Sequence, residues 1–93
     1  MPTLLTDDQI STFLSEHSAW QQEGKEITRT FQFEDFNQSL GFVVRVGLKA
    51  ERMFHHPDIS VSWNRVTLTL STHSEGGLTE LDLELAEFAD GAV

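Results

Sequence analysis

The 93-residue sequence contains no cysteine and only six lysine or arginine residues. Without cysteine the chain has no disulfide framework, no thiolate zinc site and no cysteine nucleophile. It also lacks a basic segment at its start and any run of about 18 apolar residues, so we expect neither a signal peptide nor a membrane span. The cytoplasm is therefore the expected compartment.

Negative charge dominates, because 15 acidic residues against six basic ones give a formal charge of −9. The basic residues are scattered, and a chain of this charge is repelled by phosphate backbones, which disfavours direct nucleic-acid binding. Hydrophobic residues make up 39% and charged residues 23%, a globular balance. We expect residues 1–93 to form one domain, with any role near DNA depending on a protein partner.

The spacing of apolar residues predicts the order helix, strand, strand, helix, strand, strand, helix. A first helix follows the capping box Thr6–Gln9, two strands flank Gly24, a hairpin covers 59–70, and a last helix begins at Thr79. This order predicts an α+β domain in which a four-stranded antiparallel sheet carries three helices on one face.

The long central helix is predicted to be apolar on two sides. Asp35 and Gln38 provide its cap, and Pro57 requires that it end before that residue. One stripe at helical spacing reads as the core face. Three apolar residues off that stripe fit either a deeply buried helix or an oligomer face, and we favour the oligomer face because so small a domain cannot surround a helix. The stripe is Phe36, Leu40, Val43, Gly47, Ala50 and Phe54; the residues off it are Phe42, Val46 and Met53.

Histidines and a carboxylate gather where the central helix, the second hairpin and the last helix meet. His55 and His56 follow the central helix, His73 ends the hairpin, and Asp82 lies one turn into the last helix. A carboxylate can hold an imidazole in one tautomer. His17, on the polar side of the first helix, is interpreted as a solvated side chain.

Three interpretations of these histidines stay open on the pattern alone. The histidines could cap a helix end, where the dipole favours cations. They could hold a metal with Asp82, although the helical H-x-x-x-H spacing and cysteine ligands are absent. They could also carry metal-free acid–base catalysis, because imidazole exchanges protons near neutral pH.

The motif E-x3-HHP-x5-W-x9-H-x8-D, from Glu51 to Asp82, closely resembles the signature of the pterin-4a-carbinolamine dehydratases. The resemblance extends from about Trp20 to Phe88. It implies dehydration of 4a-hydroxytetrahydrobiopterin to the quinonoid dihydropterin, which recycles the tetrahydropterin, without metal or organic cofactor. It also implies a homodimer or a dimer of dimers.

Carried over by position, the resemblance implies catalytic roles for His55, His56, His73 and Asp82. The substrate-binding set would be Glu51, Pro57, Trp63 and Thr72. At Trp63 an aromatic wall for the pterin and a core strand residue fit the pattern equally well.

A non-catalytic protein-binding module is the alternative function. Members of the resembled family act as dimerisation partners of a transcription factor, and degenerate relatives act as assembly chaperones. Because degenerate members would be expected to lose the histidines, the complete set here favours the enzyme.

Overall fold

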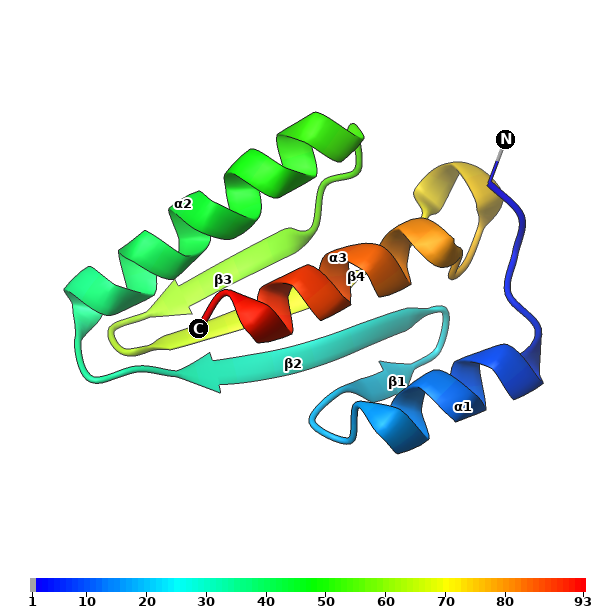
Figure 1. Cartoon of the computed structure of the whole chain (residues 1–93), viewed down its shortest axis with the longest axis horizontal. Coiled ribbons are helices and arrows are strands. Elements are labelled where there is room, and N and C mark those ends of the chain that lie inside the picture. The colour runs from blue at the N-terminus through cyan, green and yellow to red at the C-terminus, as the bar shows by residue number, and fades with distance from the viewer. Residues whose placement is uncertain (1) are drawn as a thin grey trace.

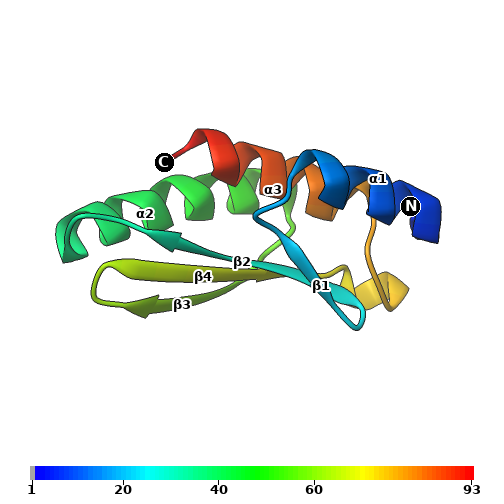
Figure 2. The same ribbon diagram turned by 90° about the horizontal axis from the view of Figure 1, so that it is seen from below.

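The computed structural model describes residues 2–93, in which a curved sheet lies beneath a layer of helices (Figures 1 and 2). The elements in chain order are α1 (Asp7–Glu16), β1 (Gln21–Glu23), β2 (Glu26–Gln32), α2 (Phe36–Met53), β3 (Asp58–Ser62), β4 (Arg65–Leu70), the short 3-10 helix η1 (His73–Glu75) and α3 (Glu80–Gly91). The predicted element order and the α+β class are confirmed; η1 was not predicted.

The sheet is antiparallel throughout and has the strand order β1-β2-β4-β3. Strands β2 and β4 form its centre, with Ile27 opposite Leu70 and Phe31 opposite Val66. Strand β3 is an edge strand, and all five of its residues are exposed. Because β3 and β4 are joined as a hairpin, the end of α2 and the end of β4 come to the same side of the molecule (Figure 1).

Side-chain caps start all three α-helices at the predicted residues. Thr6 and Gln9 form a capping box on α1, and the Asp35 side chain accepts from the Gln38 amide at α2. Thr79 and Asp82 form the capping box of α3. Each cap satisfies backbone N–H groups that a helix start leaves without partners.

The core lies between the inner face of the sheet and the three helices. Aromatic rings form its centre: the Phe31 and Phe42 centroids are 4.6 Å apart, and Trp20 packs edge-on against Phe31. Arg29 also lies on this inner face, where Asp90 of α3 accepts from its guanidinium at 2.5 Å and from the Trp20 indole at 2.9 Å. The buried apolar residues are Ile10, Phe13, Trp20, Ile27, Phe31, Phe42, Val46, Ala50, Val66, Leu68, Leu70, Leu78, Leu85, Ala86 and Ala89.

The sequence assignment of the two faces of α2 was wrong at most positions. Ala50 is buried and Val43 packs against the core as predicted, but Phe54, also predicted in the core, is 85% exposed. Phe42 and Val46, predicted to form the oligomer face, are fully buried in the core, and Met53 packs against that core. The exposed apolar stripe instead contains residues that the pattern placed in the core or left unassigned: Phe36, Leu40, Val44 and Leu48, which are 49%, 44%, 59% and 65% exposed. Ser39 also lies on the buried face of α2, where its hydroxyl donates to the Asp35 carbonyl.

Two valines on α2 offer a direct test of this assignment. Val46→Ala removes two methyl groups from the core and is expected to lower the free energy of unfolding by about 2 kcal/mol. Val44→Ala, on the exposed stripe, is expected to change it by less than about 0.5 kcal/mol when unfolding is measured at dilutions where the chain is monomeric. Urea unfolding of both variants measures the difference, and equal effects would contradict the assignment.

The turn of the β3–β4 hairpin is one residue earlier than predicted. Ser62 pairs with Arg65, so Trp63 and Asn64 form the turn rather than Asn64 and Arg65. Trp63 has a left-handed φ of 50° and is 66% exposed. Trp63 is therefore a turn residue, and its interpretation as a core strand residue is wrong.

Candidate active site

His55 is directed into the protein by the way α2 ends. Phe54 adopts the left-handed conformation, with φ 51° and ψ 39°, and its amide donates to the last turn of the helix. The His55 amide then donates to the Ala50 carbonyl at 3.1 Å. This closed C-terminus reverses the chain, so the first residue after the helix turns inward while Phe54 stays exposed.

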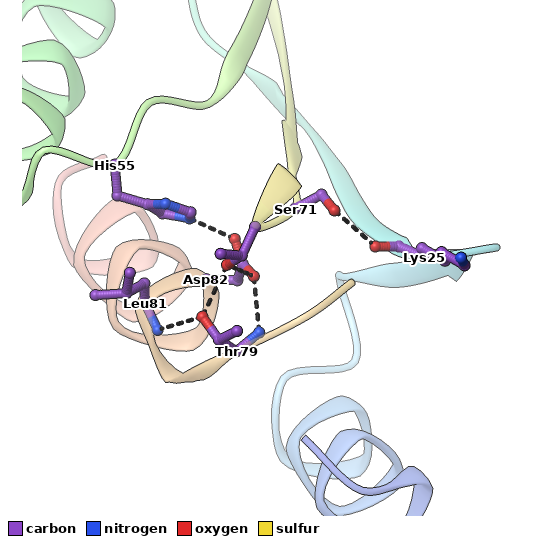
Figure 3. A network of polar contacts seen from close by, with 7 residues as sticks. Lys25, His55, Ser71, Thr79, Leu81 and Asp82 are labelled. Atoms are coloured by element: carbon purple, nitrogen blue, oxygen red, sulfur yellow. Dashed lines mark hydrogen bonds and ion pairs between the residues drawn. The ribbon is translucent and has the colours of Figure 1, made fainter. Parts of the chain in front are cut away.

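The inward turn brings His55 to Asp82, as Figure 3 shows. Nε2 of His55 lies 2.5 Å from Oδ1 of Asp82. The histidine is 8% exposed and the carboxylate is fully buried. A buried imidazole and a buried carboxylate from segments 27 residues apart in sequence are thus held in direct contact.

Two threonines complete the surroundings of Asp82. Its Oδ2 accepts from the Thr79 amide at 2.9 Å and from the Thr72 hydroxyl at 2.8 Å. The two hydroxyls lie 2.7 Å apart, and both threonines are buried. We call His55, Thr72, Thr79 and Asp82 the Asp82 network.

The backbone around Thr72 is fixed on both sides. Its N–H donates to the Gly77 carbonyl at 2.8 Å, and the Gly77 N–H returns a bond to the Thr72 carbonyl at 3.3 Å. The neighbouring Ser71 hydroxyl donates to the Lys25 carbonyl at 2.9 Å, which ties the end of β4 to the β1–β2 turn (Figure 3). These backbone contacts hold Thr72 where its hydroxyl donates to Asp82.

His56 contacts Glu51 at the surface rather than Asp82. Its Nε2 lies 2.8 Å from Oε1 of Glu51, and both side chains are exposed. The half-buried Pro57 follows and starts the extended chain of β3. Glu51, His56 and Pro57 therefore gather at the solvent side of His55.

His73 follows the Asp82 network directly along the chain. It begins η1, is exposed, and directly follows Thr72, whose hydroxyl binds Asp82. The segment that follows β4 thus places Thr72 in the buried Asp82 network and His73 at the surface. The structure brings His55, His56, His73 and Asp82 to one end of the sheet.

Trp63 is not part of this group within one chain. It lies at the far end of β3 from Pro57. Five strand residues separate the two, a length of roughly 17 Å. A single chain therefore gives Trp63 no contact with the Asp82 network.

Other features of the molecule lie apart from this region. A cavity of about 410 Å³ between α1 and α3 is lined by Phe13, His17, Glu80 and Glu87 among others. His17 is half-buried rather than solvated, because it stacks on Phe13 with the ring centroids 4.1 Å apart. Within residues 2–93, no group of three or more histidine and acidic side chains is arranged to hold a metal ion, and no helix is long and apolar enough to cross a membrane.

Comparison with known proteins gives one family over nearly the whole chain. The family model described as pterin 4 alpha carbinolamine dehydratase matches residues 3–92. A protein of Nocardia farcinica is 51% identical over 94% of this chain and 92% of its own length, and one of Roseiflexus sp. is 44% identical over 97% of both chains. Both carry the provisional name pterin-4-alpha-carbinolamine dehydratase.

Two solved structures have the same fold. One, described as a transcriptional coactivator/pterin dehydratase from Brucella melitensis, has a TM-score of 0.92 and 38% identity, covering 97% of this chain and 98% of its own. A pterin dehydratase-like protein described as a RuBisCO assembly factor in the alpha-carboxysome has a TM-score of 0.69 and 24% identity, covering 82% and 90%. The second likeness concerns the fold alone.

Proposed function

Because the chain belongs to the pterin 4 alpha carbinolamine dehydratase family, we propose that it removes water from 4a-hydroxytetrahydrobiopterin to give the quinonoid dihydropterin. The observation that carries this proposal is the contact between His55 and the buried Asp82, with two further histidines beside it. A lone capping histidine would need no buried carboxylate partner, so the arrangement favours acid–base chemistry over a structural role.

The proposed reaction needs one base and one acid. The base removes the proton from the ring nitrogen next to the carbinolamine carbon, and the electron pair of that N–H bond forms the C=N bond. The C–O bond breaks as the acid gives its proton to the departing hydroxyl, which leaves as water. Each well-placed proton transfer contributes roughly 10²–10⁴-fold, and no metal or organic cofactor takes part.

The positions of the side chains support a division of roles. His55, held by Asp82, and His73 at the surface flank the carbinolamine as a base and acid pair. His56, Glu51 and Pro57 form the solvent side of the site and bind the pterin. Trp63 can act as an aromatic wall only if a second copy of the chain supplies it.

A stopped-flow assay tests the activity. Freshly generated 4a-hydroxytetrahydrobiopterin is mixed with buffer or with this protein, and the quinonoid product is followed by absorbance. Acceleration by the protein is the expected result. Folded protein that gives no acceleration would contradict the proposal and favour the non-catalytic binding module.

We further propose that the protein self-associates through α2. The exposed stripe Phe36, Leu40, Val44 and Leu48 repeats every four residues along an 18-residue helix about 27 Å long. Monomeric proteins rarely leave so continuous an apolar row in water. A second copy, packed with its α2 antiparallel across a two-fold axis, covers one stripe with the other.

Val44→Glu is expected to shift this protein to monomers, because it places a charge in the middle of the stripe without touching the core. Sedimentation velocity at micromolar concentration measures the change, with Ser11→Glu on the exposed side of α1 as the control that keeps the assembly. A strictly monomeric wild type would overturn the proposed interface.

A further inference from the structure

We infer that Thr72 and Thr79 are positioning residues which, through Asp82, keep the proton of neutral His55 on Nε2 and leave Nδ1 as the basic atom. The arrangement of protons follows from the hydrogen bonds alone. Only its consequence for catalysis, that Nδ1 takes the substrate proton, rests on the proposed dehydratase function.

The direction of each hydrogen bond in the Asp82 network is determined by its neighbours. The backbone N–H groups of Thr79 and Leu81 can only donate, to Oδ2 of Asp82 and to the Thr79 hydroxyl. A carboxylate can only accept, so the single hydroxyl hydrogen of Thr72 points to Asp82. At the 2.7 Å contact between the two hydroxyls, Thr79 must therefore donate and Thr72 must accept.

Several hydrogen-bond donors are directed at the carboxylate of Asp82. Oδ2 receives two of them, the Thr79 amide and the Thr72 hydroxyl. Asp82 is also the third residue of α3, where the positive end of the helix dipole favours an anion. Imidazole is ordinarily the stronger base of the two groups. Oδ1 therefore accepts, and the hydrogen of the contact with His55 belongs to Nε2.

Neutral imidazole carries one hydrogen, so Nδ1 of His55 holds a free lone pair. In the part of the chain that the structure describes, Nδ1 of His55 has no hydrogen-bond partner. Every fully buried side-chain nitrogen or oxygen in that part does have a partner, so Nδ1 is not among the fully buried atoms, although His55 as a whole is only 8% exposed.

This geometry assigns the base and the acid. Nδ1 of His55 takes the proton of the ring nitrogen, and the resulting imidazolium donates from Nε2 to the ionised Asp82, which stabilises it. The hydroxyl then receives its proton from another group, for which the exposed His73 is available. After each turnover His55 releases its proton to solvent and His73 takes one up.

Nitrogen NMR of the imidazole rings tests the proton arrangement without any substrate. At pH about 8, where histidines are ordinarily neutral, long-range proton–nitrogen correlations distinguish the two tautomers. We expect His55 to carry its hydrogen on Nε2. His17 gives an internal reference of the opposite tautomer, because its Nδ1 lies 3.0 Å from the Phe13 carbonyl, which can only accept. A hydrogen on Nδ1 of His55 would overturn the inference.

Asp82→Asn tests the role of the carboxylate in the same spectrum. The carboxamide of asparagine can donate as well as accept. We expect a substantial population of His55 with the hydrogen on Nδ1. A folded variant with the wild-type tautomer alone would contradict the role of Asp82, and the wild-type spectrum remains decisive if the variant does not fold.

Thr72→Val tests the positioning role by removing one donor to Asp82 at nearly constant volume. We expect kcat to fall roughly fivefold with KM unchanged, and Thr72→Ser to restore it. Thr67→Val is the matched control, because Thr67 also binds a threonine hydroxyl, that of Thr30 at 2.8 Å, but on the open face of the sheet. Unchanged kcat in Thr72→Val, or a raised KM alone, would overturn the positioning role.

The two proposals fail in different ways. Protein that shows the Nε2 tautomer but no dehydration would contradict the proposed function and support the proton arrangement. Protein that dehydrates the substrate with the hydrogen on Nδ1 would contradict the proton arrangement and support the function.

Discussion

Replacing His55 by glutamine is expected to lower kcat roughly thousandfold. Glutamine is an amide that can still donate to Asp82, so the buried carboxylate keeps its partner and the fold is retained. The variant has no basic nitrogen to take the proton of the ring nitrogen. Because the chemical step and not binding is affected, KM should change little.

Stopped-flow turnover, with circular dichroism to verify folding, measures the effect of His55→Gln. His17→Gln is the control, because His17 lies on α1 against Phe13 and takes no part in the site. Its kcat is expected to stay within about twofold of wild type. A His55→Gln variant that is folded and retains more than about a tenth of wild-type kcat would rule out His55 as the base.

His73→Ala is expected to lower kcat roughly a hundredfold, less than the loss at His55. The smaller loss is expected because the His73 side chain is exposed to solvent. His73 is at the surface, so water can readily replace it as the proton donor, whereas His55 is only 8% exposed and water can replace it far less well. The stability of the variant should equal that of wild type, because an exposed side chain is removed.

Ser74→Ala is the matched control for His73, because Ser74 is the next exposed residue of η1. Thermal unfolding and stopped-flow turnover of both variants separate a catalytic from a structural effect. Near-normal turnover in His73→Ala would contradict its role as the acid.

Most of the fold could be predicted because each element carries a local signal. The capping pairs at Thr6, Asp35 and Thr79 start the helices, and alternating apolar residues identify the strands. The faces of α2 carried no such signal. Both sides of that helix are apolar, and only the packing against the sheet decides that Phe42 and Val46 lie inside.

The sequence predicted which residues gather at the candidate site, but it did not predict which of them contact one another. His55, His56, His73 and Asp82 lie at one end of the sheet, but the sequence does not indicate that only His55 reaches Asp82. That difference comes from the left-handed Phe54, which a sequence pattern does not reveal because such a conformation is uncommon outside glycine.

The two threonines of the Asp82 network show a second limit of prediction from sequence. Thr72 was predicted to bind substrate, which stays a prediction, and its hydroxyl contact with Asp82 was not foreseen; Thr79 was predicted only as a helix cap. The capping pair Thr79–Asp82 was a usable signal, because it places the Asp82 carboxylate at the buried start of α3. The contact with Thr72 arises only from the tertiary fold.

Asp82 belongs both to the capping box of α3 and to the contact with His55. The start of this helix therefore needs the same carboxylate that the proposed chemistry needs. A relative that lost the reaction would still keep an aspartate here to preserve its fold, whereas nothing in the helix start requires a histidine at 55. When homologous sequences are sorted into enzymes and non-enzymes, the histidine positions should therefore discriminate between them and the aspartate should not.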